Sequence, residues 1–379
     1  MSDRFTTADV ARQLDDCTFC PKMCRHACPV STTTGRESLI PQAKMDLLNR
    51  LRRGTEAWQA DAAEPLWACT GCRHCTVYCD HGNEPGLVLL AGRAAAQRAG
   101  AGHANLVGYG ERFRARDQRL ATQAKEHLAD APFAEGGDVG FWPGCDSLDK
   151  GAADVAAAQA VFVRMGLGAV PLVDAGLACA GYPLLAAGLV DEFRWHAGKV
   201  ASALRRFRTV VMGCSACRYA VTALFQGEGV TVATEVVSVA EFLDDHAAAL
   251  PPATRARAVY YHDPCYLARS AGVIDEPRRV LGQLAEVREF AWSGVDAECC
   301  GGGGLLPKTM PAVADAMARR RLAEIAATGG GTVATACGTC ALMLRRNAPE
   351  GVEVRDLATL VAELTDTAFT PPADPGDEP

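Results

Sequence analysis

The chain has 379 residues, enough for two or three domains that each bury a hydrophobic core. Its apolar fraction of 49% and charged fraction of 22% are typical of a soluble globular protein. A formal net charge of −7 gives no general attraction to nucleic acid, and no apolar run reaches the length of about 18 residues that predicts a transmembrane helix.

Cysteine is the unusual component of the chain, with 17 residues. Thiols at this density are either paired in disulfides or bound to metal. The first twenty residues lack the apolar stretch of a signal peptide. We therefore expect the protein in the cytoplasm, either free or bound peripherally to the inner face of the membrane. Thiols stay reduced there, so the cysteines predict metal binding.

Residues 1–95 contain two cysteine runs. The first has the spacing C-x2-C-x3-C-x3-C, and the second has the ferredoxin spacing C-x2-C-x2-C-x3-C. In ferredoxins, three thiolates of one run bind one 4Fe–4S cubane and the fourth reaches the other cluster. The predicted ligand sets are Cys17, Cys20, Cys24 and Cys79 for one cubane, and Cys69, Cys72, Cys75 and Cys28 for the other.

Two departures from the ferredoxin pattern weaken part of this assignment. One extra residue precedes Cys24, and Asp80 stands where proline usually follows the second run. A pair of zinc ribbons is the alternative interpretation. Zinc needs two C-x2-C pairs per ion, however, and four cysteines within eleven or twelve residues suit a cubane better.

Between the cysteine runs, apolar residues recur at three- and four-residue spacing. This periodicity predicts an amphipathic helix over residues 36–53 that ends at Gly54. Two cysteine runs about 40 residues apart with a helix between them resemble the α-helical ferredoxin domain of succinate dehydrogenase iron–sulfur subunits and heterodisulfide reductase C subunits. Residues 96–137 are expected to form a helical connector, and residues 366–379 a disordered acidic tail.

The C-terminal part contains an internal repeat. Short β-type runs end at Cys145 and at Cys265, 120 residues apart, and Cys179 and Cys299 have the same offset. A C-x2-C pair closes each copy at an offset of 123. Repetition at a fixed period indicates two copies of one structural unit.

The two copies span residues 138–255 and residues 256–365. Each alternates β-type runs with helical segments such as residues 149–165 and 311–327, which predicts an α/β unit with short parallel strands. Ligands of such units collect beyond the carboxyl ends of the strands, where the cysteines follow. The expected fold is an α+β multidomain one: a helical two-cluster domain followed by two pseudo-repeated cysteine-rich units.

The second unit carries more thiols than one tetrahedral zinc can use. They are Cys265, Cys299, Cys300, Cys337 and Cys340. Their spacing, C-x33-C-C-x36-C-x2-C, resembles the signature of the cysteine-rich, or CCG, domain family. That family includes heterodisulfide reductase B and D subunits, glycolate oxidase iron–sulfur subunits and the C subunit of anaerobic glycerol-3-phosphate dehydrogenase. The order of domains here is similar to that of the D-type and glycerophosphate C-type members.

The resemblance covers roughly residues 15–345 and carries a functional expectation. It implies a catalytic, non-cubane 4Fe–4S cluster on the five cysteines of the second unit. In heterodisulfide reductases such a centre cleaves a disulfide, and in other members it is thought to pass electrons between a flavoprotein and a quinone. Fold and family do not choose between these activities.

The first unit departs from the family pattern. Ala180 follows Cys179, where the second unit has Cys300. A five-thiolate cluster is therefore excluded in this degenerate unit. The thiols that remain are Cys145, Cys179, Cys214 and Cys217. A structural zinc, an ordinary cubane and no metal at all remain open for them.

The glycine run after Cys300 is not a phosphate-binding loop, because Pro307 stands where that motif needs its second glycine. We expect Gly301 and Gly302 to let the backbone approach the cluster and donate N–H groups to its sulfurs. His262 has two interpretations, a hydrogen-bond or proton donor to the cluster and an ordinary structural histidine.

These features predict an iron–sulfur electron-transfer oxidoreductase subunit of the heterodisulfide reductase type. No nucleotide-binding fingerprint appears, so flavin or nicotinamide chemistry is expected from a partner, a flavoprotein dehydrogenase or an electron-transferring flavoprotein. A quinone or a membrane anchor protein is a further possible partner, and nucleic acid is not expected. The alternatives are a zinc-rich structural or binding module and a pure electron wire without substrate chemistry.

Overall fold

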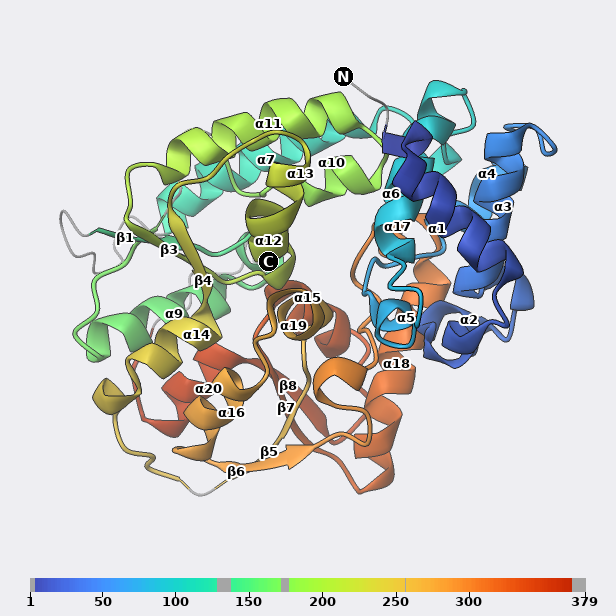
Figure 1. Ribbon diagram of the computed structural model, residues 1–379. Coiled ribbons are helices and arrows are strands. Elements are labelled where there is room, and N and C mark those ends of the chain that lie inside the picture. Colours follow the sequence, from blue (N-terminus) through green and yellow to red (C-terminus); the bar gives the residue numbers. More distant parts are fainter. Residues whose placement is uncertain (1–3, 128–137, 172–176, 256, 370–379) are drawn as a thin grey trace, which may run out of the picture.

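The computed structural model describes residues 4–127, 138–171, 177–255 and 257–369. A helical N-terminal part lies beside two α/β units, each built on its own sheet (Figure 1). This arrangement confirms the predicted α+β multidomain fold. In the described segments, no helix is both long enough and apolar enough to cross a bilayer.

The N-terminal part consists of helices that surround the two cysteine loops. They are α1 (Ala8–Phe19), α2 (Pro29–Thr34), α3 (Pro41–Arg53), α4 (Ala60–Ala63), α5 (His74–Val77), α6 (Pro85–Arg98) and α7 (Tyr109–His127). Helices α1, α3 and α6 pack against one another and bury Leu14, Leu48 and Val88, each at most 2% exposed. This apolar core holds the cysteine loops in place.

Helix α3 begins later than the periodicity predicts. Glu37–Leu39 form a 3-10 turn, and Pro41 is the first residue of the helix. Proline is favoured at that position because its φ fits a helix and an N–H there would have no partner in the first turn. The helix ends before Gly54, whose φ of 71° is left-handed, as the sequence predicts.

The first unit contains a four-stranded parallel sheet in the order β2-β1-β3-β4. The strands are β1 (Val139–Trp142), β2 (Val170–Pro171), β3 (Thr209–Met212) and β4 (Glu235–Ser238). The helices are α8 (Cys145–Lys150), α9 (Ala152–Arg164), α10 (Tyr182–Ala186), α11 (Val190–Leu204), α12 (Ser215–Tyr219), α13 (Phe225–Gly227) and α14 (Val239–Asp245). Helix α7 reaches across from the N-terminal part and packs on α8 and α10.

The second unit repeats this topology with a parallel sheet in the order β6-β5-β7-β8. The strands are β5 (Ala258–Tyr261), β6 (Glu286–Glu289), β7 (Gly331–Thr335) and β8 (Val352–Asp356). The helices are α15 (Cys265–Ala271), α16 (Asp275–Gly282), α17 (Leu306–Thr309), α18 (Pro311–Ala327), α19 (Gly338–Arg345) and α20 (Leu357–Leu364). Because both sheets have the same strand order, the predicted internal repeat is confirmed.

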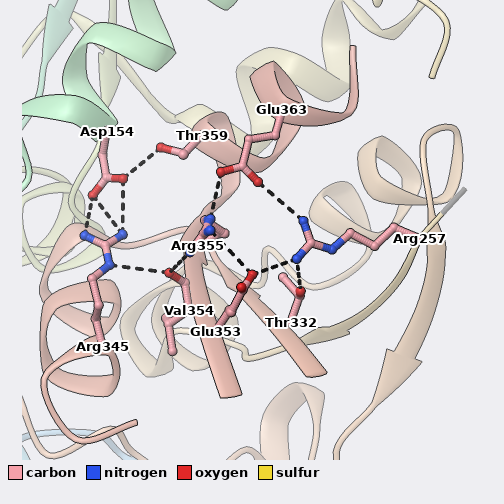
Figure 2. A network of polar contacts seen from close by, with 9 residues as sticks. All are labelled: Asp154, Arg257, Thr332, Arg345, Glu353, Val354, Arg355, Thr359 and Glu363. Atoms are coloured by element: carbon pink, nitrogen blue, oxygen red, sulfur yellow. Dashed lines mark hydrogen bonds and ion pairs between the residues drawn. The ribbon is translucent and has the colours of Figure 1, made fainter. Parts of the chain in front are cut away.

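A polar network links the two units (Figure 2). Asp154 of α9 accepts hydrogen bonds at 3.2 Å from both terminal nitrogens of Arg345 in α19, and Thr359 of α20 donates to it at 2.7 Å. Asp154 is 8% exposed. A carboxylate so well buried needs this pairing, so the two units are held in one arrangement.

The predicted domain limits stay predictions. Helix α6 runs through the limit set at residue 95, and residues 128–137, which include the connector's end, lie outside the described residues. The same holds for residues 370–379 of the predicted tail. The start of that tail packs on the second unit, since Thr367 is 9% exposed and its hydroxyl lies 2.7 Å from that of Thr365.

Candidate metal–sulfur centres

The cysteines of both α/β units stand at the carboxyl ends of strands. Cys145 opens α8 after β1, and Cys265 opens α15 after β5. Cys214 and Cys337 cap α12 and α19 after β3 and β7. The carboxyl ends of parallel strands meet at one edge of a sheet, so the thiols of each unit gather at one edge.

The structure brings the five predicted thiols of the second unit together, and we call them the five-thiol set. Its members Cys265, Cys299, Cys300, Cys337 and Cys340 are each at most 6% exposed. The sulfurs of Cys300 and Cys340 are 3.3 Å apart, and Cys299 lies in side-chain contact with Cys265 and Cys300. Buried thiols in contact cannot all ionise unless positive charge lies among them, which a bound metal supplies. The donor set therefore fits a metal–sulfur centre with more than four ligands.

The glycine loop after Cys300 has two separate roles. The N–H groups of Gly301 and Gly302 each lie 3.4 Å from a thiol sulfur, that of Cys299 and that of Cys300. A Cβ on Gly303 would lie 2.5 Å from the carbonyl oxygen of Thr70, and one on Gly304 would clash with the neighbouring carbonyl of Cys69. The last two glycines thus let the loop pack against a ferredoxin-type cysteine run, a role that sequence reasoning missed.

The N-terminal cysteines form the two groups that the spacing predicts. The thiol of Cys24 lies close to those of Cys17, Cys20 and Cys79. Burial, the main cause, raises the pKa of Cys17 to about 11 and that of Cys24 to about 12. The second group, which we call the inner set, surrounds one small pocket and consists of Cys28, Cys69, Cys72 and Cys75. Their role as ligands stays a proposal.

Two buried cations lie beside the inner set. Lys44, 1% exposed, donates to the carbonyl oxygen of Ala68 at 2.7 Å and lies 3.7 Å from the sulfur of Cys28. Burial alone would lower the pKa of Lys44, but the nearby thiolates, Cys28 first, outweigh it and raise the pKa. Arg93, also 1% exposed, donates to four backbone carbonyls. Within the described part of the chain, neither has a carboxylate in hydrogen-bond range.

These cations were not predicted, although Lys44 does have a sequence signal. It stands on the apolar stripe of the predicted helix, where a charged residue is unexpected. A buried cation without a carboxylate needs other negative charge nearby. Thiolates, or an anionic iron–sulfur–thiolate centre, supply that charge.

The loop that carries the inner set is clamped to the second unit. The hydroxyl of Tyr266 donates to the carbonyl oxygen of Thr70 at 2.5 Å, and Arg269 donates to that of Cys72 at 2.6 Å. The thiol of Cys299 lies close enough to that of Cys72 to raise its pKa, together with burial. The inner set therefore adjoins the five-thiol set directly.

The first unit gathers its thiols next to the same place. Cys179 contacts Cys145 and Cys217, and Cys214 contacts Cys217 and, across the unit boundary, Cys337. Ala180, fully buried, occupies the position that Cys300 has in the second unit. The structure thus places all four predicted residues near one another, and the three alternatives of zinc, a cubane and no metal stay open.

Helix α7 contributes to the first unit's site, which sequence reasoning missed. Arg116 donates to Asp146 at 3.1 Å and to Asp149 at 3.0 Å. The carboxylate of Asp117 accepts the backbone N–H groups of Ala178 and Cys179 at 2.9 and 2.8 Å. Arg116 of α7 therefore has its acidic partners, Asp146 and Asp149, within the same chain.

A cavity of about 340 Å³ lies between the two units. Thiols of both units line it, together with Tyr182 and Tyr266, whose hydroxyls are 2.7 Å apart. Its walls carry charges of both signs: Lys308 and Arg346 line it, and so does Arg116 with its partners Asp146 and Asp149. The cavity therefore borders the five-thiol set directly.

His262 lies directly behind the five-thiol set. It is 1% exposed, and one of its ring nitrogens lies within 4.8 Å of the sulfurs of Cys300 and Cys340. Its Nδ1 accepts a hydrogen bond from Nε of Arg321 at 3.1 Å. Burial, and then the positive charge of Arg321, lower the pKa of His262 to about 3, so the imidazole is neutral.

Two groups of four thiols in a helical domain, followed by a duplicated unit with thiols at its strand ends, define a class of iron–sulfur proteins. Residues 13–83 match the family of 4Fe-4S dicluster domains, and residues 259–345 match the family of cysteine-rich, or CCG, domains. The chain therefore contains a match to each of these two families, in the order that the cysteine runs indicate, and the resemblance stated from the cysteine spacing is confirmed.

Similar proteins include two named subunits of reductases and a ferredoxin. The chain is 26% identical to the D subunit of the dihydromethanophenazine:CoB–CoM heterodisulfide reductase of Methanosarcina acetivorans, over 94% of this chain and 95% of that protein. It is 27% identical to the B subunit of the fumarate reductase (CoM/CoB) of Methanothermobacter marburgensis, over 81% of this chain and 62% of that protein, so it spans less than two thirds of that relative. A probable membrane-anchored ferredoxin of Chromohalobacter salexigens is 38% identical over 32% of this chain and 18% of its own length.

Proposed function

We propose that this protein is the electron-transferring and substrate-reducing component of an oxidoreductase complex. Two 4Fe–4S cubanes in the N-terminal domain would relay electrons to or from a five-thiolate, non-cubane 4Fe–4S centre in the second unit. The observation that carries this proposal is the clamping of the loop that contains Cys72 onto the second unit, through the hydrogen bonds that Tyr266 and Arg269 donate to it. Electron transfer between centres depends on such closeness.

The residues that would hold the clusters are those gathered by the fold. The first cubane would use Cys17, Cys20, Cys24 and Cys79, the second the inner set, and the third centre the five-thiol set. When bound, such clusters supply one-electron steps at potentials set by charge, hydrogen bonds and burial. The chain itself buries the sulfurs and directs the N–H groups of Gly301 and Gly302 at those of Cys299 and Cys300.

For the substrate we propose a small disulfide with anionic groups. Lys308 at the wall of the cavity beside the five-thiol set favours an anionic group. Two of the relatives carry CoM and CoB in their names. Reduction would convert one disulfide, two electrons and two protons into two thiols. A quinone is the second candidate, and the probable membrane-anchored ferredoxin among the relatives favours it.

Partner proteins are part of the proposal because the relatives are subunits of complexes. A flavoprotein dehydrogenase or an electron-transferring flavoprotein would exchange electrons with the more exposed group of Cys17, Cys20, Cys24 and Cys79. Three of these four thiols are partly exposed, whereas those of the five-thiol set are buried. A quinone-linked complex would add a membrane anchor protein.

Metal content tests the proposal against a zinc-rich module. Anaerobically purified protein should be brown and hold about eight to twelve irons, for two to three clusters of four. The five-thiol set should add a signal that is separate from those of the cubanes. Colourless protein that contains only zinc would refute the proposal.

A further inference from the structure

A buried pair, His262 and Arg321, stands behind the five-thiol set. His262 follows β5 and Arg321 lies in α18, and they are 1% and 3% exposed. The guanidinium of Arg321 lies 3.9 Å from the ring centre of Phe290, which fixes its position from the other side. The pair is therefore buried from solvent.

The hydrogen bond between them decides the protonation of the imidazole ring. Arginine is only a donor, so Nδ1 of His262 must be an acceptor. A neutral imidazole that accepts at Nδ1 carries its hydrogen on Nε2. In the described structure this buried Nε2 has no hydrogen-bond partner. Because Nδ1 is already used, Nε2 is the nitrogen left for the sulfurs of Cys300 and Cys340.

We propose that His262 donates its Nε2–H to a sulfur of the five-thiolate centre and that Arg321 is the positioning residue that keeps it a donor. The inference rests on the proposed function, since it needs a centre on these cysteines. A histidine that binds metal donates its other ring N–H to a carboxylate, a carbonyl or water. Here the other nitrogen faces a donor instead, so the arrangement excludes His262 as a metal ligand.

The first unit supports the donor role independently. Trp142 stands 120 residues before His262, at the equivalent position of the repeat. It is 1% exposed, and its indole nitrogen also has no partner among the described residues. An indole N–H is only a donor and cannot bind metal. Both copies of the unit therefore place a buried N–H donor three residues before the strand-end cysteine.

An N–H group directed at a sulfur stabilises the more negatively charged, reduced state of an iron–sulfur centre and raises its potential. Loss of the donor should make the potential of the five-thiolate centre more negative and leave the two cubanes unchanged. Loss of Arg321 should change the same potential through His262, because nothing would then keep the hydrogen of the imidazole on Nε2.

The test uses the full-length, cluster-loaded protein with the substitutions His262→Gln, His262→Leu, Arg321→Lys and Arg321→Met. Three quantities are measured: iron per chain, the midpoint potential of each centre, and proton and nitrogen hyperfine couplings of the third centre in H₂O and D₂O. His246→Leu is the matched control, because Nδ1 of His246 lies 2.8 Å from the carbonyl oxygen of Phe242 in its own helix segment.

We expect wild-type protein to show an exchangeable proton coupling on the third centre that His262→Leu abolishes. His262→Gln, whose amide N–H replaces Nε2–H, should retain part of the coupling and of the potential. Arg321→Met should weaken the coupling, and Arg321→Lys should restore it in part. Iron per chain and the cubane potentials should match those of the control throughout.

Two results would overturn the inference. One is a nitrogen coupling strong enough for ligation, lost together with iron in His262→Gln, which would make His262 a ligand. The other is an exchangeable proton coupling and a potential that no substitution changes. Failure of the proposed function is separate, because wild-type protein would then show no third centre at all.

Discussion

Replacement of Cys300 by alanine tests whether the second unit holds an active centre. The change removes one sulfur that lies 3.3 Å from that of Cys340 at a site 3% exposed. It leaves the second unit with the same four cysteine positions as the first unit, in which Ala180 stands at the equivalent position and is fully buried. The fold tolerates alanine there, so we expect a loss of only about 1 kcal/mol in the free energy of unfolding.

The effect of Cys300→Ala on activity should be much larger. Substitutions that only support a metal ligand cost about 10–100-fold, and loss of a ligand should cost at least about 100-fold. Reduction of small disulfides by a one-electron dye measures it, and the spectra of the two cubanes serve as an internal check. Cys217→Ala in the first unit is the matched control and should retain most of this activity.

Full activity of Cys300→Ala with unchanged iron content would refute the five-thiolate centre. It would favour the alternative of an electron wire, in which the second unit never reacts with substrate. Loss of all three cluster signals would instead show that Cys300 is needed for assembly, and the sulfur's role would then be tested with Cys300→Ser.

Buried charged and titratable groups supply three further predictions. Lys44→Met removes a buried cation beside the inner set and should make the potential of that cubane alone more negative, measured by redox titration; an unchanged potential would contradict the charge-balance argument. Arg345→Met should lower the free energy of unfolding by about 2 kcal/mol. This is less than the about 3–5 kcal/mol expected for a fully buried ion pair, because Arg345 is 37% exposed. Denaturant titration measures the loss, with Asp154→Asn as the variant of the other partner. Burial lowers the pKa of His74 from 6.5 to about 4. Below pH 6.5 the unfolded chain therefore binds a proton at His74 that the folded protein does not bind, and the free energy of unfolding falls as the pH drops from 6.5 towards 4. Between pH 7.5 and 5.5 the loss should be about 1.3 kcal/mol, and His74→Gln should abolish it.

The repeat and its cysteines were predictable because their signal is local. Each strand-end cysteine follows a short β-type run, and the offsets of 120 and 123 residues tie Cys145 to Cys265 and Cys214 to Cys337. Two parallel sheets of the same strand order follow from this repetition. The late start of α3 was also readable, since Pro41 is a favoured first residue of a helix.

The contacts between parts of the chain were not predictable from local patterns. Gly303 and Gly304 had no role of their own in the sequence analysis, yet they pack against a loop more than 200 residues earlier. Arg321 lies inside a helix with no motif, and only the fold brings it to His262. Such pairs carry no sequence signal, because their separation in the chain does not constrain their distance in space.

The clamped loop holds the inner set against the five-thiol set. Tyr266 and Arg269 follow Cys265 in α15, and both donate to carbonyls of the loop that carries Cys72. Arg93 bonds that loop and the glycine loop at once, through the carbonyls of Cys69 and Gly304. Each of these hydrogen bonds needs both loops in place, so any displacement of one loop leaves buried donors unsatisfied. The distance between the two centres is therefore set by the same side chains that shield them from water.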